Sequence, residues 1–270
     1  MEKGFYKVTS DAYHTEEPWA DYVSRSILHK VLRSPQHALF PDVDKPALAF
    51  GRPFHTYVLE NELFDSLYAV KPLNMSFATK EGKKWRDENE GLKEIIPFED
   101  NLKIQAMYMS LRLNKTAKAL LSNGDSEISG CWPDPKFPEI WCKCRIDWVN
   151  KEQRVLVDLK TVRDCRTFER DAWKFGYDME AAWYCYGATQ ITGVEHNAFY
   201  FICVEKEPPF GVMVYRATDE LLGMGLERCS KAMEIIKECQ DTNVWPGYPD
   251  TVTELYPPAW AKKEEGVTWN

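Results

Sequence analysis

The amino-acid sequence predicts an α/β fold in which a central mixed β-sheet is flanked by helices. Two blocks of strand-like apolar runs, at 126–161 and 197–217, are separated by a helical segment, and further helical segments precede and follow them. The 270 residues show no internal repeat and no low-complexity linker. We therefore expect one domain over 1–270, with its core at about 20–240 and an irregular tail at 241–270.

Local patterns justify the helices in turn. Ser24 or Ser26 is a suitable N-cap for the first helix. In the second, Phe50 and Phe54 recur at helical spacing, while Pro53 predicts a kink or a helix start nearby. The third is polar, the fourth is amphipathic, and the last has an apolar face. The helices are expected at 21–36, 46–62, 79–93, 99–122, 166–191 and 217–239.

Strands are predicted where apolar and β-branched residues run between turn-forming residues. The Pro-containing stretch at 134–138 and the polar stretch at 150–153 are the turns of the first block. The strands are expected at 126–132, 139–149, 154–161, 197–205 and 211–217.

The charge balance restricts the function classes. The chain carries 34 basic and 42 acidic residues, a net charge of −8. This argues against a protein that coats nucleic acid non-specifically, but it allows an enzyme with a local basic channel. No apolar run approaches the roughly 20 residues that cross a bilayer, and the first residues lack a signal-peptide core. We expect a cytoplasmic protein with no membrane partner.

None of the eight cysteines forms a Cys-x-x-Cys pair of the zinc-binding type, and the Cys142-x-Cys144 spacing is not a zinc pattern. Buried, reduced thiols are therefore the preferred interpretation. The alternative is an iron–sulfur cluster held by four cysteines, which predicts visible absorbance in the purified protein.

Two carboxylates and a lysine lie on successive predicted strands. Residues two apart on a strand share a face, so Asp158 and Lys160 project together, and the turn folds Asp147 back toward them. Paired buried carboxylates repel, and a divalent cation relieves the conflict. Mg²⁺ prefers such oxygen ligands, with Mn²⁺ as a substitute. Lys160 is placed to act on a water or a phosphate, which predicts phosphodiester hydrolysis by a metal-activated water.

A plain hairpin with a surface Asp–Lys pair is the alternative, since Asp-x-Lys alone is a weak signal. The apolar strand "RVLVDLKT" delivers its charges at its carboxyl end, where active sites of α/β sheets lie, and this favours the catalytic interpretation.

The segments "YVSRSILHKVLRSPQHALF", "KPALAFGRPFHTYVLE", "CRIDWV", "VLVDLKT" and "YDMEAAWYCYG" follow one another along the chain. In this order they resemble the RecE-type (exonuclease VIII) phage exonucleases of the PD-(D/E)XK nuclease superfamily, over about residues 5–240. The first aspartate follows Ile146 instead of the proline common in that superfamily. The sequence contains two Pro-Asp dipeptides, Pro133-Asp134 and Pro249-Asp250, but neither fits the strand that must precede "VDLKT".

The resemblance implies further site residues. His55 would be a third metal ligand beside Asp147 and Asp158, although a lone helical histidine is more often structural. Leu159, between Asp158 and Lys160, is included in the expected metal site.

On the following helix, Tyr177, Glu180 and Tyr184 share one face. Glu180 and Tyr184 are expected to shape the scissile-phosphate side, and Tyr177 is a weaker candidate. Glu180 replaces the usual glutamine, so its role is open, with a solvated surface glutamate as the alternative.

Other candidates divide between binding and structural roles. Glu127 would reach the metal site through water, or it is an exposed strand residue. By the same resemblance, Ser24, Arg25, Ser26 and Arg52 would bind a DNA 5′-phosphate, with helix capping as the rival role for the serines. Lys143 and Arg145 would line a DNA-facing surface, or they form the wet face of their strand.

The resemblance implies a Mg²⁺-dependent 5′→3′ exonuclease that digests double-stranded DNA ends and leaves 3′ single-stranded tails. Its partner would be a phage-type single-strand annealing protein, and its source bacterial or phage-encoded. A ring of three or four subunits would reconcile the charge of −8 with a positive channel. The alternatives are an endonuclease or repair nuclease of other polarity, and a non-catalytic DNA-binding relative.

Overall fold

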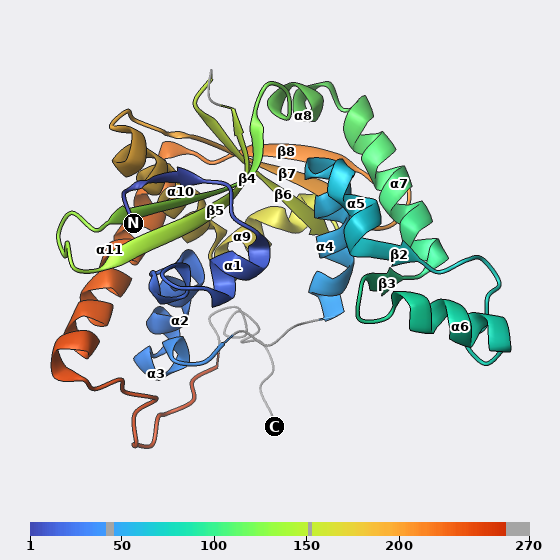
Figure 1. Cartoon of the computed structure of the whole chain (residues 1–270). Helices are drawn as coiled ribbons and strands as arrows, with labels where there is room; N and C mark the ends of the chain where they lie inside the picture. Colours follow the sequence, from blue (N-terminus) through green and yellow to red (C-terminus); the bar gives the residue numbers. More distant parts are fainter. Residues whose placement is uncertain (42–45, 151–152, 258–270) are drawn as a thin grey trace, which may run out of the picture.

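The computed structural model describes residues 1–41, 46–150 and 153–257. Its centre is a six-stranded sheet in the order β1-β4-β5-β6-β7-β8, in which only β6 and β7 run parallel, and β2 and β3 form a separate parallel pair (Figure 1). The strands are β1 Gly4–Tyr6, β2 Tyr68–Val70, β3 Glu94–Ile96, β4 Asp125–Pro133, β5 Trp141–Asn150, β6 Val155–Val162, β7 Ala198–Glu205 and β8 Val212–Arg216.

Helices pack on both faces of the large sheet (Figure 1). The α-helices are α1 Ser10–Thr15, α2 Arg25–Arg33, α3 Pro35–Ala38, α4 Pro46–Leu59, α5 Asn61–Leu67, α6 Lys80–Asn89, α7 Phe98–Leu113, α8 Lys115–Leu120, α9 Phe168–Phe175, α10 Tyr177–Thr192 and α11 Asp219–Thr242. Two short 3₁₀ helices are η1 Trp19–Asp21 and η2 Cys165–Thr167.

The core divides into two layers, one on each face. The larger layer packs α2, α9, α10 and α11 on the sheet, with Trp132 and Trp183 fully buried. The other packs α4 and α7 on the opposite face around Phe54 and Leu159. Buried surface of this extent is the main favourable term in folding. The predicted mixed sheet with flanking helices is confirmed.

Four of the predicted helices are interrupted. The segment 21–36 breaks at Ser34 and the segment 46–62 breaks at Glu60. The segment 99–122 breaks at Asn114, whose side chain accepts a hydrogen bond from the Ala117 N–H (3.0 Å) and caps α8. The segment 166–191 breaks at Gly176, which has the left-handed φ of 70° that favours glycine.

Other differences lie at the margins of the expected core. The sequence analysis missed β1 and α1, which precede it, and the β2–β3 pair. In the turn at 150–153, residues 151–152 lie outside the described residues, as does the end of the expected tail at 258–270. Among the residues that are described, none of the helices combines the length and apolarity that a membrane span needs.

Candidate active site

Three carboxylates occupy neighbouring positions on β4, β5 and β6. The pairs Ser126↔Trp148 and Ile128↔Ile146 flank Glu127 and Asp147, so these two lie opposite each other. The β5–β6 ladder ends at Trp148↔Val157, and its next step sets Asp147 opposite Asp158. Sheet register therefore places Asp147 between two other acidic residues. Like charges directly opposite each other are destabilising in a sheet, which marks this row as a site.

The backbone at Glu127 is strained. Its φ of 51° is left-handed, although it lies inside a β-strand and is not glycine. Such strain costs on the order of 1–3 kcal/mol and concentrates at functional sites. The Glu127 carboxylate is held by Arg145, whose Nε donates to Oε2 at 2.7 Å. The surface-residue alternative for Glu127 does not fit, because only 15% of its side chain is exposed.

Helix α4 brings His55 to the carboxylates. The His55 Nδ1 lies 3.5 Å from Asp147 Oδ2. One ligand atom each from His55, Glu127 and Asp147 lies within 4.8 Å of the others, the one cluster of this kind within the described part of the chain. Phe54 is fully buried beside it, which fixes the face that α4 turns to the sheet. The structure thus brings His55 and Glu127 together with Asp147, so that each of the three could offer one ligand atom to the same ion.

Burial is the main cause of the shifted pKa values of the three residues in this cluster. Burial, with Asp158 as the next cause, raises the pKa of Asp147 to about 7. Burial and the Asp147 charge raise the pKa of Glu127 to about 7 as well. Burial lowers the pKa of His55, which favours the neutral imidazole that ligates metals.

The donor set fits a divalent cation. Asp158 is buried, and its Oδ2 accepts no hydrogen bond of acceptable geometry within the described residues, although Lys160 Nζ lies 2.7 Å away. Asp147 Oδ2 accepts a hydrogen bond from the Leu159 N–H at 2.8 Å. This hydrogen bond orients the Asp147 carboxylate, and it takes the place of a backbone hydrogen bond between the strands. Carboxylate oxygens and one imidazole suit Mg²⁺ or Mn²⁺. Leu159 therefore contacts the site through its backbone N–H, whereas the Leu159 side chain is buried in the core.

Lys160 links the carboxylates to α10. Its Nζ lies 2.7 Å from Asp158 Oδ2 and 2.6 Å from Glu180 Oε1. Burial alone lowers the pKa of Lys160, but Asp158, Tyr177 and Asp147 together hold it above its usual value. The lysine is therefore a cation in this site and is suited to stabilising negative charge.

Glu180 is not a solvated glutamate. Only 3% of the residue is exposed, and its carboxylate pairs with Arg25 of α2 as well as with Lys160. The two cations compensate the charge that the expected glutamine would not carry. The side chain joins α2, β6 and α10 at the site.

The two tyrosines of this face differ in position. The Lys160 Nζ lies 4.5 Å from the ring centroid of Tyr177, a cation–π contact. Tyr184 packs on Phe199 with ring centroids 6.2 Å apart. Burial, then Tyr13 and to a smaller extent Asp158, raises the pKa of the Tyr184 phenol, so it remains protonated.

Three of the four predicted phosphate-binding residues lie at the start of α2. Ser24 caps the helix by accepting the Ile27 N–H (3.4 Å), and its Oγ lies 2.9 Å from that of Ser26. The capping role of Ser24 is thus observed. Arg25 contacts the site through Glu180, whereas Arg52 on α4 is 45% exposed and lies 3.6 Å from Glu94.

Lys143 and Arg145 do not lie where the sequence analysis expected them. Lys143 is buried, and its Nζ donates to the carbonyls of Tyr13 (2.8 Å) and Trp19 (2.6 Å). Arg145 donates to Val8 O (2.8 Å) as well as to Glu127. Both cations are engaged in holding the N-terminal segment, so neither the DNA-facing nor the wet-face interpretation matches their contacts. Alternation along the strand did not reveal the segment that covers it.

All eight cysteines are buried and free. Burial raises the pKa of the Cys185 thiol to about 12, so it stays neutral. Among the described residues, the one group of side chains that could hold a metal ion contains no cysteine.

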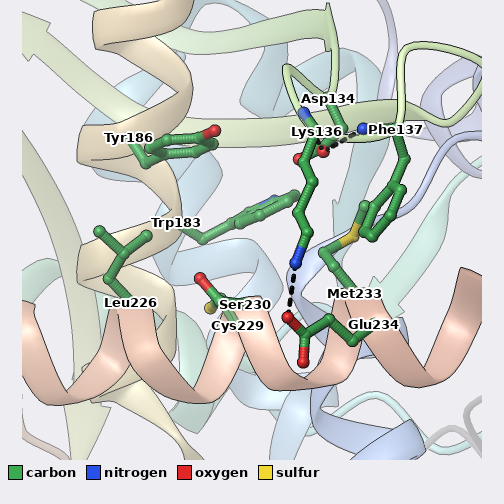
Figure 2. A pocket seen from close by; sticks show the side chains of 10 residues that line it. All are labelled: Asp134, Lys136, Phe137, Trp183, Tyr186, Leu226, Cys229, Ser230, Met233 and Glu234. Carbon is green, nitrogen blue, oxygen red and sulfur yellow. Dashed lines mark hydrogen bonds and ion pairs between the residues drawn. The ribbon is translucent and has the colours of Figure 1, made fainter.

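A small cavity of about 140 Å³ lies apart from the carboxylates, between α10, α11 and the β4–β5 turn (Figure 2). The Lys136–Glu234 ion pair (2.6 Å) crosses it. Asp134 lines it and accepts the N–H groups of Lys136 and Phe137, both at 2.9 Å. The Pro-Asp pair at this position is thus a turn-forming element away from the metal cluster.

The profile of a protein family described as a PDDEXK-like domain of unknown function (DUF3799) matches residues 24–254. Among solved structures, the chain resembles a candidate exonuclease from Eubacterium rectale, with a TM-score of 0.66, 17% identity, and coverage of 97% of this chain and 100% of that one. A phage-related exonuclease from Haemophilus somnus 129PT matches with a TM-score of 0.34, 13% identity, and coverage of 83% and 96%. No curated protein matches the sequence.

Proposed function

Since this chain belongs to the PDDEXK-like family of unknown function DUF3799, we propose that it is a metal-dependent deoxyribonuclease that hydrolyses phosphodiester bonds. The observation that carries the proposal is the row formed by Glu127, Asp147 and Asp158 across three adjacent strands. His55 from one sheet face and Lys160 beside Asp158 complete it.

The side chains of the site have different proposed roles. His55, Glu127, Asp147 and Asp158 would hold Mg²⁺ or Mn²⁺, which supplies Lewis-acid activation of a water and of the phosphate. Lys160, kept protonated by its neighbours, stabilises the charge that develops on the phosphate oxygens. The Leu159 N–H fixes the Asp147 carboxylate during the reaction.

Glu180 holds Lys160 and Arg25 in a common orientation before substrate binds. Arg25 then sits at the start of α2 beside the catalytic lysine, a position suited to a DNA phosphate. Ser26 and Arg52 are proposed to contact the same strand.

The finer proposal follows the RecE-type resemblance. The enzyme would digest double-stranded DNA from its ends in the 5′→3′ direction with Mg²⁺, leaving a 3′ single strand. It would act in phage-type recombination with a single-strand annealing protein, as a ring of three or four copies. A ring allows an acidic exterior around a channel into which the cations of each copy point.

The test is a digestion of four substrates. Linear duplexes with and without a 5′-phosphate, a linear single strand and a covalently closed circle are incubated with Mg²⁺ or with EDTA. Loss of the linear duplexes only, from the 5′ end and only with Mg²⁺, is the expected result. The rate difference between the two duplexes measures the contribution of the 5′-phosphate.

The other outcomes assign other functions. Cutting of the closed circle makes the protein an endonuclease with the same metal site. Digestion from the 3′ end makes it a repair nuclease of the other polarity. No cleavage with either Mg²⁺ or Mn²⁺ contradicts the enzymatic proposal and favours a non-catalytic DNA-binding relative.

A further inference from the structure

Two exposed aromatic rings lie in the last turn of α9, and one of them, Phe175, packs near Tyr177, which contacts Lys160. Trp173 and Phe175 are 51% and 43% exposed, and they flank the exposed Lys174 in the last turn of α9. We call residues 173–175 the aromatic turn. Aromatic side chains contribute strongly to burial and interface energetics, so two of them left in water beside an active site point to contact with a ligand.

Short contacts connect the aromatic turn to the active site. Arg25 donates to the Phe175 carbonyl at 3.4 Å while pairing with Glu180. The Phe175 ring lies 6.0 Å from that of Tyr177, over which Lys160 Nζ sits at 4.5 Å. The turn therefore borders the place where the scissile phosphate would meet Lys160.

The aromatic turn is held in a fixed position. Gly176, with its φ of 70°, approaches α2 so closely that a Cβ there would meet His29 Cδ2 at 2.7 Å. The Arg228 guanidinium lies 5.0 Å from the Trp173 ring centroid and is itself anchored by the buried Asp178 at 2.6 and 2.7 Å. A rigid aromatic pair loses little conformational entropy when it binds a planar ligand.

The charges around the rings identify that ligand. Arg25, Lys174 and Arg228 surround the two aromatic residues, and Lys174 Nζ lies 5.3 Å from the Phe175 ring. Proteins bind single-stranded nucleic acid with aromatic rings that stack on the bases and with nearby cations that contact the phosphates. A base inside a duplex has both faces covered by its neighbours, whereas the bases of a separated strand can unstack and offer a face to these rings.

We propose that Trp173 and Phe175 form a stacking site for unpaired DNA bases adjacent to the phosphodiester that is cut. This deepens the proposed nuclease function and rests on it. The site would hold the strand being digested after its bases separate from the complementary strand, and so favour frayed ends over fully paired ones.

The test measures binding of fluorescein-labelled single-stranded oligonucleotides by anisotropy in EDTA, where cleavage cannot occur. Each oligonucleotide is compared with an abasic version of the same length. Trp173→Ala and Phe175→Ala should each weaken binding of the normal strand about tenfold and leave the abasic strand within about twofold of wild type. Trp173→Phe, which keeps a ring, should retain most of the affinity.

Two controls separate stacking from damage to the fold. Phe175→Leu keeps an apolar side chain but no ring, so it should behave as Phe175→Ala. Leu113→Ala removes an exposed apolar side chain from α7, on the other sheet face, and should bind like wild type. Equal losses for normal and abasic strands, or no loss for either, would overturn the stacking site.

Cleavage by the wild type with Mg²⁺ is measured in parallel. If the wild type cuts DNA and the alanine variants bind normal strands as it does, the stacking site fails and the nuclease stands. If the wild type cuts nothing while the base-dependent loss is seen, the nuclease fails and the residues remain a nucleic-acid binding site.

Discussion

At the scale of single residues, Asp147 lies at the centre of the candidate site. It faces Glu127 on one strand and Asp158 on the other, approaches His55, and accepts the Leu159 N–H. A row of three adjacent carboxylates would bind a cation well, because folding has already met the cost of bringing the ligands together.

Lys160→Ala should lower the cleavage rate by at least about 100-fold, because it removes the cation that stabilises phosphate charge. The measurement is the single-turnover rate on linear duplex DNA with Mg²⁺, with folding checked by circular dichroism. A folded variant that cleaves at the wild-type rate contradicts the assigned role.

Glu127→Gln should weaken metal binding, because it removes one charged ligand while keeping the shape. Mn²⁺ at about 100 times its Kd should stabilise the wild type by about 2.7 kcal/mol, seen as a rise in Tm, and the variant should respond less at the same concentration. Glu139→Gln, an exposed carboxylate in the β4–β5 turn, is the matched control. A full Mn²⁺ response in Glu127→Gln would remove Glu127 from the ligand set.

Glu180→Gln and Arg25→Gln should each destabilise the fold by about 1–3 kcal/mol, because each breaks the largely buried Arg25–Glu180 ion pair. The double variant should lose less than the sum, since the two changes remove one interaction. Urea unfolding of the four proteins gives the coupling energy. Strict additivity would show that the two side chains act independently.

At the scale of elements, the N-terminal segment is fastened to β5 by two cations. Lys143 binds the carbonyls of Tyr13 and Trp19, and Arg145 joins Val8 O to Glu127. The conformation of Glu127 is thereby tied to the docking of a segment more than 100 residues earlier in the chain.

The buried Lys143 gives stability a defined pH dependence. Burial lowers the pKa of Lys143 to about 8, below the value of about 10.4 in an unfolded chain. Between these values the unfolded chain binds more protons, so this group makes the free energy of unfolding rise with pH from about 8 to about 10.5.

Lys143→Met tests this dependence. The difference in unfolding free energy between wild type and variant should grow by up to about 3 kcal/mol in favour of the wild type across that window. The buried thiols titrate in both proteins and cancel in the difference. A difference that stays constant with pH would show that Lys143 keeps its ordinary pKa.

At the scale of the whole molecule, the net charge of −8 contrasts with the group of cations, Arg25, Lys160 and Arg228, near the aromatic turn. An acidic monomer repels DNA at long range, and this repulsion weakens with salt. Assembly around a common channel would concentrate the cations where the duplex passes.

Light scattering after size-exclusion chromatography should therefore give a trimer or tetramer. The assembly should be processive, so that excess unlabelled DNA added after the start stops few of the digestions in progress. A monomer that leaves its substrate after each cut would contradict the ring.

Much of the site could be predicted from local sequence. Strand alternation put Asp158 and Lys160 on one face, and the turn brought Asp147 to them, because both effects depend on residues close in the chain. The position of Glu127 could also be predicted from the sequence, because a hairpin centred on Phe137 sets Glu127 opposite Asp147. The strained φ of Glu127 could not be predicted, since a left-handed backbone at a glutamate has no sequence signature.

Only the tertiary structure decided which charges meet across long separations. Glu180 pairs with Arg25, and Lys143 with the carbonyls of Tyr13 and Trp19, because the packing of helices and the N-terminal segment on the sheet brings them together. The sequence by itself determined the α/β class and the Asp–Asp–Lys core, which arise from short-range periodicity. Burial determined the state of each charge, because desolvation depends on everything packed around a group and not on its neighbours in the chain.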